Sequence, residues 1–473
     1  MTRSGRRDFL RTALCATASS AAFGSMLGKL SLAHAATPKA LAGTDYRALV
    51  FVYLSGGNDA FNMLVPRDAA HHATYAAARG PLALARDSLL PINPLVAPSD
   101  GASYGLHPRM AGLQQLFEAG RAAIVSNVGP LLYPITKAQY QTETVPAPMQ
   151  IASHSDQEVL WQMPQGESLG ARLGWGGKLA DLYAAGSTSN LPMSVSLGGE
   201  NVFQAGADTA PYYMGAYGVD AISPIDYPNP RRAAFEAILA QSYAHPFERA
   251  YVQKLQRSRA LAAQVALALE AQPENAAPFN AFDTAWQALP TPREMPGIGR
   301  DLKMIARMIA ARTTLNAQRQ IFYVSMGGFD THATQLADHA ELLEDLSVAL
   351  KTFHDVLASP QLAVGSRVTT FTGSEFGRSL FNNGDGTDHA WGGHQLVVGG
   401  AVNGRRIYGT MPSLVGDSDL NPDDTGYGHI IPTLAVEQYA ATLAKWYGVS
   451  DTDRALIFPN LGRFSTPNLG FLA

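Results

Sequence analysis

The sequence has a single cysteine, Cys15, and it lies within the first 35 of 473 residues. With no second cysteine, the chain can form no internal disulfide, and removal of residues 1–35 would also leave it without a thiol nucleophile. Charged residues make up only 16% of the chain, and its formal net charge is −4. Because no Lys/Arg-rich block follows the N-terminus, there is no electrostatic case for nucleic-acid binding. After Ala35 no uninterrupted apolar run approaches the roughly 20 residues of a membrane span, so we expect no membrane association after cleavage.

The first 35 residues have the pattern of a cleavable export signal. Arg6 and Arg7 form a twin-arginine pair, a weakly apolar stretch follows at 12–32, and residues 33–35 provide a small-x-small cleavage sequence. A membrane anchor is the alternative, but the serines, glycines and lysine of the stretch make it too polar for hydrocarbon. We therefore predict a signal peptide over residues 1–35, read by the twin-arginine translocase, and a periplasmic or secreted location for residues 36–473.

The remaining chain alternates continuous apolar runs with helical patterns. Continuous apolar runs are typical of strands buried on both faces of a parallel sheet, and apolar residues at helical spacing predict helices with one buried stripe. The patterns predict strands at 48–54, 122–128, 320–325 and 367–372, and helices at 108–120 and 335–357. Strand, helix and strand at this spacing form the crossover unit of a parallel sheet.

The middle of the chain has a different composition. Residues 231–271 are rich in Ala, Leu, Gln and Glu and are interrupted by Pro246, and a second helical pattern at 300–318 follows a Pro-rich loop. We predict one α/β domain over 36–473 with a helical insertion around 231–318.

Polar clusters follow three of the predicted strands. Gly56-Gly57-Asn58-Asp59 comes after the first, Gly327 to His332 after the third, and Ser374 to Arg378 after the fourth, with His389 close behind. The carboxyl ends of parallel strands meet at one edge of a sheet, where ligands bind. Carboxylate and imidazole groups suit a divalent metal, so we predict a site for zinc, manganese or iron. Its candidate ligands are Asp59, Asp330, His332, Glu375 and His389.

Each cluster also has a purely structural interpretation. Asp59 can cap a turn, and Asp330 with His332 can cap the helix that starts near Gln335. Glu375 can be a carboxylate in the first turn of a helix.

Several motifs carry a resemblance to a known family. They are Ser374-Glu375-Phe376-Gly377-Arg378 followed by Gly386-Thr387-Asp388-His389, with Leu106-His107-Pro108, Ser153-His154, Gly328-Phe329-Asp330-Thr331-His332 and Tyr408-Gly409. The chain resembles the exported bacterial family known as domain of unknown function 1501, which is related to the alkaline phosphatase and sulfatase superfamily. This resemblance implies an alkaline-phosphatase-like α/β sandwich, with a mostly parallel central sheet and helices on both faces.

The resemblance also implies roles for the candidate residues. Asp59 matches the metal ligand that ends the first strand, Asp330 and His332 resemble a ligand pair, and His389 resembles the last histidine ligand. Phe376 stands where the superfamily has a histidine, so we expect at most one tightly held ion.

By the same resemblance the protein hydrolyses phosphate or sulfate esters, and its substrate is an anionic small-molecule or polysaccharide ester. Ser153, beside His154, or a metal-bound water would attack the ester. Arg378 could hold the anion, or it could form an ion pair with Glu375 or Asp388. The alternative is a protein that kept the fold without catalysis and serves as a periplasmic binding or assembly factor.

Overall fold

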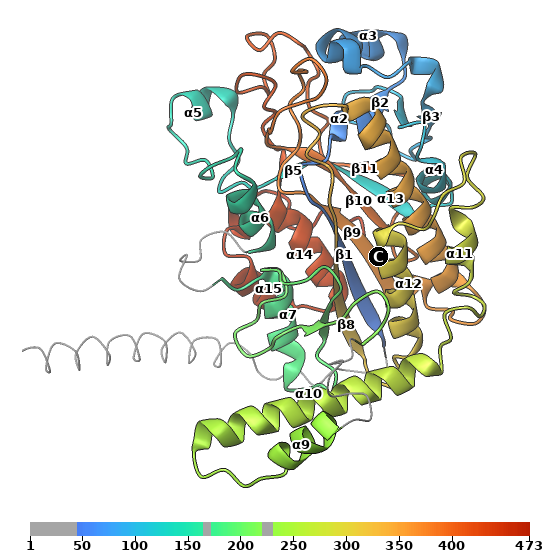
Figure 1. The fold of residues 1–473 in the computed structure, drawn as a ribbon. Helices are drawn as coiled ribbons and strands as arrows, with labels where there is room; N and C mark the ends of the chain where they lie inside the picture. Colours follow the sequence, from blue (N-terminus) through green and yellow to red (C-terminus); the bar gives the residue numbers. More distant parts are fainter. Residues whose placement is uncertain (1–44, 164–171, 220–229) are drawn as a thin grey trace, which may run out of the picture.

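The computed structural model describes residues 45–163, 172–219 and 230–473 (Figure 1). The predicted signal peptide, with Cys15, Arg6 and Arg7, lies outside these residues. No helix within the described ranges is long and apolar enough to cross a membrane.

A mixed sheet forms the centre of the described structure (Figure 1). The strands run in the order β11-β5-β10-β9-β1-β8-β6-β7, and β12 pairs with β5. Neighbouring strands are parallel except at β10, which is antiparallel to both β9 and β5. The bounds are β1 (Arg47–Leu54), β5 (Ala122–Gly129), β6 (Ser194–Ser196), β7 (Tyr212–Tyr213), β8 (Arg319–Met326), β9 (Val368–Gly373), β10 (Gly393–Gly399), β11 (Ile407–Tyr408) and β12 (Leu434–Ala435).

The central strand β1 is buried from Ala48 to Leu54. Side chains alternate between the faces of a strand, so Val50 and Val52 enter one core while Phe51 enters the other. Phe51 is in register with Phe371 of β9, and their rings stack at 4.7 Å. Full burial of such a side chain contributes about 1.5–3 kcal/mol, which explains why an uninterrupted apolar run forms this strand.

Helices cover both faces of the sheet. α4, α11, α12 and α13 pack on the face that contains Val50, and α6, α7, α14 and α15 pack on the face that contains Phe51. The helices are α2 (Ala60–Met63), α3 (Ala69–Arg79), α4 (Ala111–Glu118), α5 (Lys137–Gln141), α6 (His154–Gln162), α7 (Trp175–Ala184), α9 (Pro230–Leu239), α10 (Pro246–Glu270), α11 (Ala281–Ala285), α12 (Gly297–Ala310), α13 (Gln335–Ala358), α14 (Val436–Tyr447) and α15 (Asp451–Ile457). The predicted α/β class, with a mostly parallel sheet between helices, is confirmed.

A small antiparallel sheet stands beside the central one. It has the order β2-β4-β3, with β2 (Leu64–Pro66), β3 (Leu90–Pro91) and β4 (Tyr104–Leu106). Together with α2 and α3 it lies near the carboxyl end of β1 (Figure 1).

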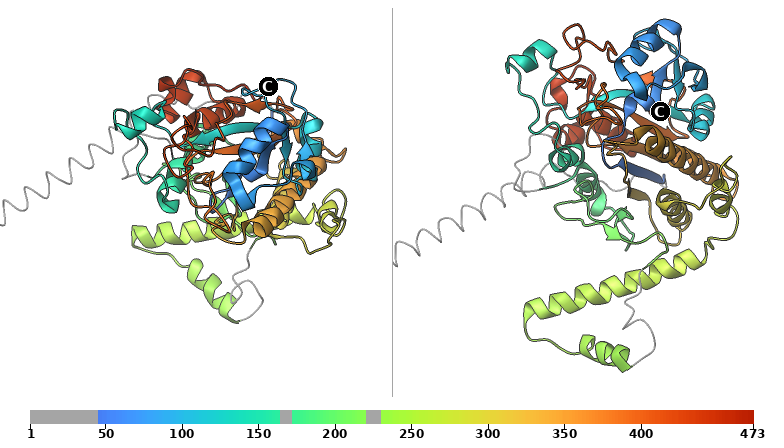
Figure 2. Two further views of the ribbon diagram at one scale, coloured as in Figure 1. Left: turned by 90° about the horizontal axis from the view of Figure 1, so that it is seen from above. Right: turned by 45° about the horizontal axis from the view of Figure 1, so that its top comes forward.

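Only the first part of the segment predicted as a helical insertion projects from the body, because α11 and α12 pack on the central sheet. α9 and α10 form an arm at the end of the molecule opposite α2 and α3 (Figures 1 and 2). Phe247 and Tyr251 of this arm are 79% and 69% exposed. The arm therefore does not cover the carboxyl edge of the central sheet, where the candidate site lies.

The sequence located the main strands to within about two residues, and both predicted helices exist. The helix expected at 300–318 is wrong at both ends, because α12 begins at Gly297 and residues 311–316 form turns. The interruption expected near Pro246 is confirmed, since α9 ends at Leu239 and Pro246 opens α10.

Candidate metal centre

Close approach of three loops builds the site at the carboxyl edge of the sheet. Gly56, which follows β1, has φ +120°, and a Cβ there would lie 2.2 Å from the backbone nitrogen of Asp330. A Cβ on Gly386 would lie 2.3 Å from the carbonyl oxygen of Thr331. These glycines allow the loops after β1 and β9 to pack directly on the loop after β8.

Three histidine side chains point their Nε2 atoms at the carboxylate of Asp330. His332 Nε2 lies 3.0 Å and His389 Nε2 lies 3.1 Å from Asp330 Oδ1. His154 Nε2 lies 3.5 Å from Asp330 Oδ2. His332 Nε2 and His389 Nε2 are themselves only 3.0 Å apart. We call these four residues, His154, Asp330, His332 and His389, the histidine cluster.

The opposite nitrogen of each ring is held by an acceptor. His154 Nδ1 lies 2.8 Å from Glu375 Oε1, and His332 Nδ1 lies 3.1 Å from Asp388 Oδ1. His389 Nδ1 lies 2.8 Å from the carbonyl oxygen of Ala152. A carbonyl or a carboxylate can only accept, so each Nδ1 donates its proton and leaves the Nε2 lone pair of the neutral ring free.

The free lone pairs explain why the cluster suits a cation. Two unprotonated nitrogens 3.0 Å apart, beside a carboxylate, repel one another unless a positive charge lies between them. Metal-ligating histidines almost always donate their other nitrogen to a carboxylate or a carbonyl, as all three rings do here. The arrangement of nitrogens and supporting acceptors is therefore suited to a metal ion.

The distances also fit an ion. One ligand atom from each of His154, Asp330 and His389 lies within 4.8 Å of the other two. Bonds of about 2.1 Å bring two ligand atoms to within about 4.2 Å, so at most a small side-chain rotation closes the site. A mixed nitrogen and oxygen set suits zinc, manganese or iron.

The histidine cluster is open to solvent. The side chains of Asp330 and His332 are 45% and 44% exposed. Partial burial alone would raise the pKa of Asp330, but the hydrogen bond and the charge of Arg378 outweigh it and hold the pKa below its ordinary value. Asp330 is thus a carboxylate at neutral pH, and solvent can reach it.

Arg378 supports Asp330 and does not face solvent. Its side chain is 0% exposed, and Nη1 donates to Asp330 Oδ1 at 2.7 Å and to the Gly56 carbonyl oxygen at 3.1 Å. The structure contradicts both sequence interpretations of Arg378: the guanidinium is too buried to reach an anion as placed, and its partner is Asp330 instead of Glu375 or Asp388. The helix start expected near Glu375 is also wrong, because residues 374–380 form a loop.

Asp59 is not brought into the histidine cluster. It is fully buried, caps α2 by accepting from the Phe61 nitrogen, and forms an ion pair with Arg79 of α3. Gln335 of α13 also donates to it. The shared metal pocket expected for Asp59 is therefore not formed, because its oxygens are engaged by a guanidinium, an amide side chain and a backbone nitrogen. The capping interpretation of Asp59 is confirmed.

Glu375 and Ser153 also have supporting roles. Glu375 is 3% exposed and binds both His154 and the Gly56 nitrogen, so it holds a histidine instead of facing the cluster's open side. Ser153 is the N-cap of α6, and its hydroxyl donates to Asp156 Oδ2 at 2.6 Å. The capping alternative for Ser153 is confirmed, and no hydrogen bond within the described ranges joins it to the histidine cluster.

The roles of Phe376 and Asp388 in orienting the histidines could not be predicted from the sequence motifs alone. Phe376, which cannot ligate, stacks on the His389 ring at 4.5 Å and lies 4.9 Å from the His154 ring. It thereby restricts the orientation of both imidazoles. Asp388, next to His389 in the sequence, orients His332 instead; its place beside a histidine was the available signal.

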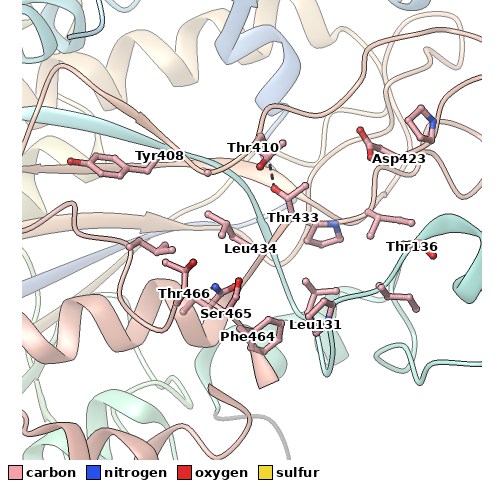
Figure 3. A pocket seen from close by; sticks show the side chains of 18 of the residues that line it. Leu131, Thr136, Tyr408, Thr410, Asp423, Thr433, Leu434, Phe464, Ser465 and Thr466 are labelled. Carbon is pink, nitrogen blue, oxygen red and sulfur yellow. Dashed lines mark hydrogen bonds between the residues drawn. The ribbon is translucent and has the colours of Figure 1, made fainter. Parts of the chain in front are cut away.

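A separate cavity of about 730 Å³ lies between the 131–137 loop and residues 408–434 and 464–469 (Figure 3). Lys137 and Asp423 are the charged residues in its lining. The Lys137 ammonium donates to the carbonyl oxygens of Ser418 and Asn421, and Asp423 accepts from the Ser413 nitrogen. None of the predicted site residues lines this cavity.

Fold and site together define an α/β protein with a candidate metal centre of histidines and aspartate at the carboxyl edge of its sheet. The chain belongs to the family described as "Protein of unknown function (DUF1501)", which matches residues 46–426. The family predicted from the motifs is confirmed. No curated protein matches the sequence.

Two solved structures show distant similarity. One is Ps i-CgsB in complex with k-i-k-neocarrahexaose, with a TM-score of 0.33 and 8% identity over 88% of this chain and 75% of that chain. The other is a 2-O GAG sulfatase, with a TM-score of 0.26 and 8% identity over 77% of this chain and 66% of that chain. Similarities at this level carry no argument about activity.

Proposed function

We propose that the protein is an exported, metal-dependent hydrolase of phosphate or sulfate esters, and that the histidine cluster is its centre. The observation that carries the proposal is the convergence of three Nε2 atoms on Asp330 while each Nδ1 is held by an acceptor. Such an arrangement is costly without a cation and typical with one.

The residues divide the work as follows. Imidazole nitrogens of His154 and His389 and the carboxylate of Asp330 would hold the ion, and His332 is the fourth ligand-type group beside them. A bound divalent ion supplies Lewis acidity toward an ester oxygen. Glu375, Asp388 and Arg378 keep the ligand atoms aimed at one point.

One ion is the expected number. Asp59 is neutralised by Arg79, and Phe376 contributes no ligand atom, so a second site cannot draw on either residue. This agrees with the expectation of at most one tightly held ion.

A second candidate is a non-catalytic role as a periplasmic binding or assembly factor. It is favoured by the engagement of Ser153 in a helix cap and by the burial of Arg378, which leave neither a free serine nucleophile nor an exposed arginine clamp from the predicted set. Turnover of an ester by the metal-loaded protein would exclude it.

The test begins with metal content. Wild type purified without chelator and supplied with zinc, manganese and iron should hold about one ion per chain, whereas Asp330→Asn should hold little, since it loses the charged ligand but keeps an oxygen for Arg378. His339→Gln is the matched control, because His339 is buried against Asn58 away from the cluster and should not affect the ion. A screen of aryl phosphate, phosphodiester and sulfate esters then tests turnover. Equal and near-zero metal in all three proteins would defeat the proposal.

Export is tested separately. Changing both Arg6 and Arg7 to Lys should leave uncleaved precursor in the cytoplasm, because the translocase recognises the arginine pair. An unchanged yield of processed periplasmic protein would contradict the twin-arginine route.

A further inference from the structure

The charges that contact the histidine cluster are unbalanced. Asp330, Glu375 and Asp388 each bind a cluster histidine, and Asp388 is 62% exposed at the open side. Arg378 is the one lysine or arginine side chain that contacts these groups within the described residues, and it is fully buried against Asp330. The site therefore has three carboxylates against one guanidinium, and one divalent ion brings it to neutrality without leaving a positive excess.

Ester substrates differ in the charge that such a site must accept. A phosphate monoester carries a charge of about −1.5 to −2 at neutral pH because its second pKa is about 6. A sulfate monoester or a phosphodiester carries a single negative charge. Sites that bind dianions usually provide several cationic donors. A neutral site with an exposed carboxylate lacks these donors.

We infer that the histidine cluster accepts a tetrahedral ester with one negative charge, a sulfate monoester or a phosphodiester, and discriminates against the dianionic phosphate monoester. This inference rests on the proposed function. In the reaction, the oxygen of water bonds to sulfur or phosphorus while the bond to the alcohol oxygen breaks. The alcohol leaves with one proton of that water, and the second proton is released as the acid product ionises.

Asp388 is the residue that enforces the discrimination. It accepts from His332 Nδ1 at 3.1 Å and also from Asn383 Nδ2 at 3.1 Å, so its carboxylate is fixed beside the cluster while facing solvent. Asp388 is 62% exposed, so its carboxylate faces any anion that approaches the histidine cluster.

Two inert anions of the same shape provide the test. Benzenesulfonate has one charge, and phenylphosphonate has two at about pH 8.5, above its second pKa. Their binding to zinc-loaded wild type is measured by calorimetry in about 0.01 M and about 0.5 M salt. We expect benzenesulfonate to bind roughly tenfold more tightly at low salt, and the preference to shrink at high salt because screening shortens the reach of the carboxylates.

Variants locate the effect. Asp388→Asn, which keeps an acceptor for His332, should reduce the preference by roughly three- to tenfold. Glu274→Gln removes an exposed carboxylate on the loop after α10 and should leave the preference unchanged. The salt series on wild type stands even if Asp388→Asn does not fold.

Turnover assays show which of the two singly charged esters, the sulfate monoester or the phosphodiester, is hydrolysed. Aryl sulfate and aryl methyl phosphodiester are compared with aryl phosphate, and activity on either of the first two above the third supports the inference. Wild type that retains its metal but binds phenylphosphonate as tightly as benzenesulfonate would overturn the inference and leave the proposed function standing. Wild type that holds no metal would overturn both.

Discussion

The loops that follow two neighbouring strands have similar sequences, but their aspartates lie in different environments. After β1 the chain reads Gly56-Gly57-Asn58-Asp59, and after the neighbouring parallel strand β8 it reads Gly327-Gly328-Phe329-Asp330. Asp59 is fully buried in an ion pair with Arg79 and caps α2, whereas Asp330 is 45% exposed among three histidines. The same motif thus gives one structural carboxylate and one ligand-type carboxylate.

The difference teaches that partners decide what a strand-end aspartate does. A guanidinium neutralises Asp59 permanently and closes it to ligands. Arg378 also binds Asp330, but through Oδ1 only, and Oδ2 remains directed toward His154. A buried Asp with Arg is a fixed ion pair, and an exposed Asp with histidines is a site whose charge is still to be balanced.

The largest expected effect on stability comes from removing the buried ion pair of Asp59. Arg79→Met leaves Asp59 charged, buried and without its guanidinium, and should lower the free energy of unfolding by about 3–5 kcal/mol in denaturant titrations. The exposed pair of Arg86 and Asp87 is the control, since Arg86→Met should cost less than about 1 kcal/mol. A destabilisation equal to that of the control would show that the Asp59 network is not structural.

A smaller effect is expected from a substitution that weakens the support of the exposed histidine cluster. Glu375→Gln keeps an oxygen to accept from His154 Nδ1 but removes the charge that makes the ring a better ligand, so it should weaken metal affinity by about 10–100-fold with little change in apo stability. Competition with a chelating dye measures this. Unchanged affinity would mean that Glu375 does not act through His154.

The smallest expected effect is a change in how the stability of the buried region depends on pH. Burial lowers the pKa of His339, which contacts Asn58, to about 4, against an ordinary value of about 6.5. Below the ordinary pKa the unfolded chain binds a proton at this histidine that the folded chain does not bind, so His339 should lower the stability by about 1 kcal/mol per pH unit as the pH drops from about 6.5 to about 4. Burial also lowers the pKa values of His107, His354 and His394, so His339→Gln should make this part of the stability profile, measured by denaturation, shallower by about that amount without making it flat. A slope unaltered by the substitution would assign the acid sensitivity to other groups.

The sequence was most informative where the signal is local. The run from Ala48 to Leu54 identified a strand buried on both faces, and the apolar stripe of 335–357 identified α13, because burial of these residues is determined by their own pattern. Asp330, His332 and His389 were grouped correctly because each follows a strand or a glycine-rich loop at the same sheet edge.

The partners of Asp59, Arg378 and Glu375 could not be predicted from local patterns in the sequence. Arg79 lies 20 positions from Asp59 in a separate helix, and His154 lies 221 positions from Glu375. Partners that meet only in the folded chain leave no periodicity, so a motif can show that a carboxylate sits at a strand end but not which cation reaches it.

The strand order has a consequence for synthesis. The central strand β1 is made early, but its two neighbours, β8 and β9, arrive much later; Tyr46, just before β1, bonds Gln320 at the start of β8, 274 positions on. Contacts of such separation slow folding, because the entropy of closing a long loop is lost before the contact forms. A ribosome-bound chain that stops before β9 has β1 with one edge unpaired, and the loop that carries Glu375, Asp388 and His389 is still absent. The histidine cluster therefore cannot be completed before about four-fifths of the chain has been synthesised, because His389 is one of its residues.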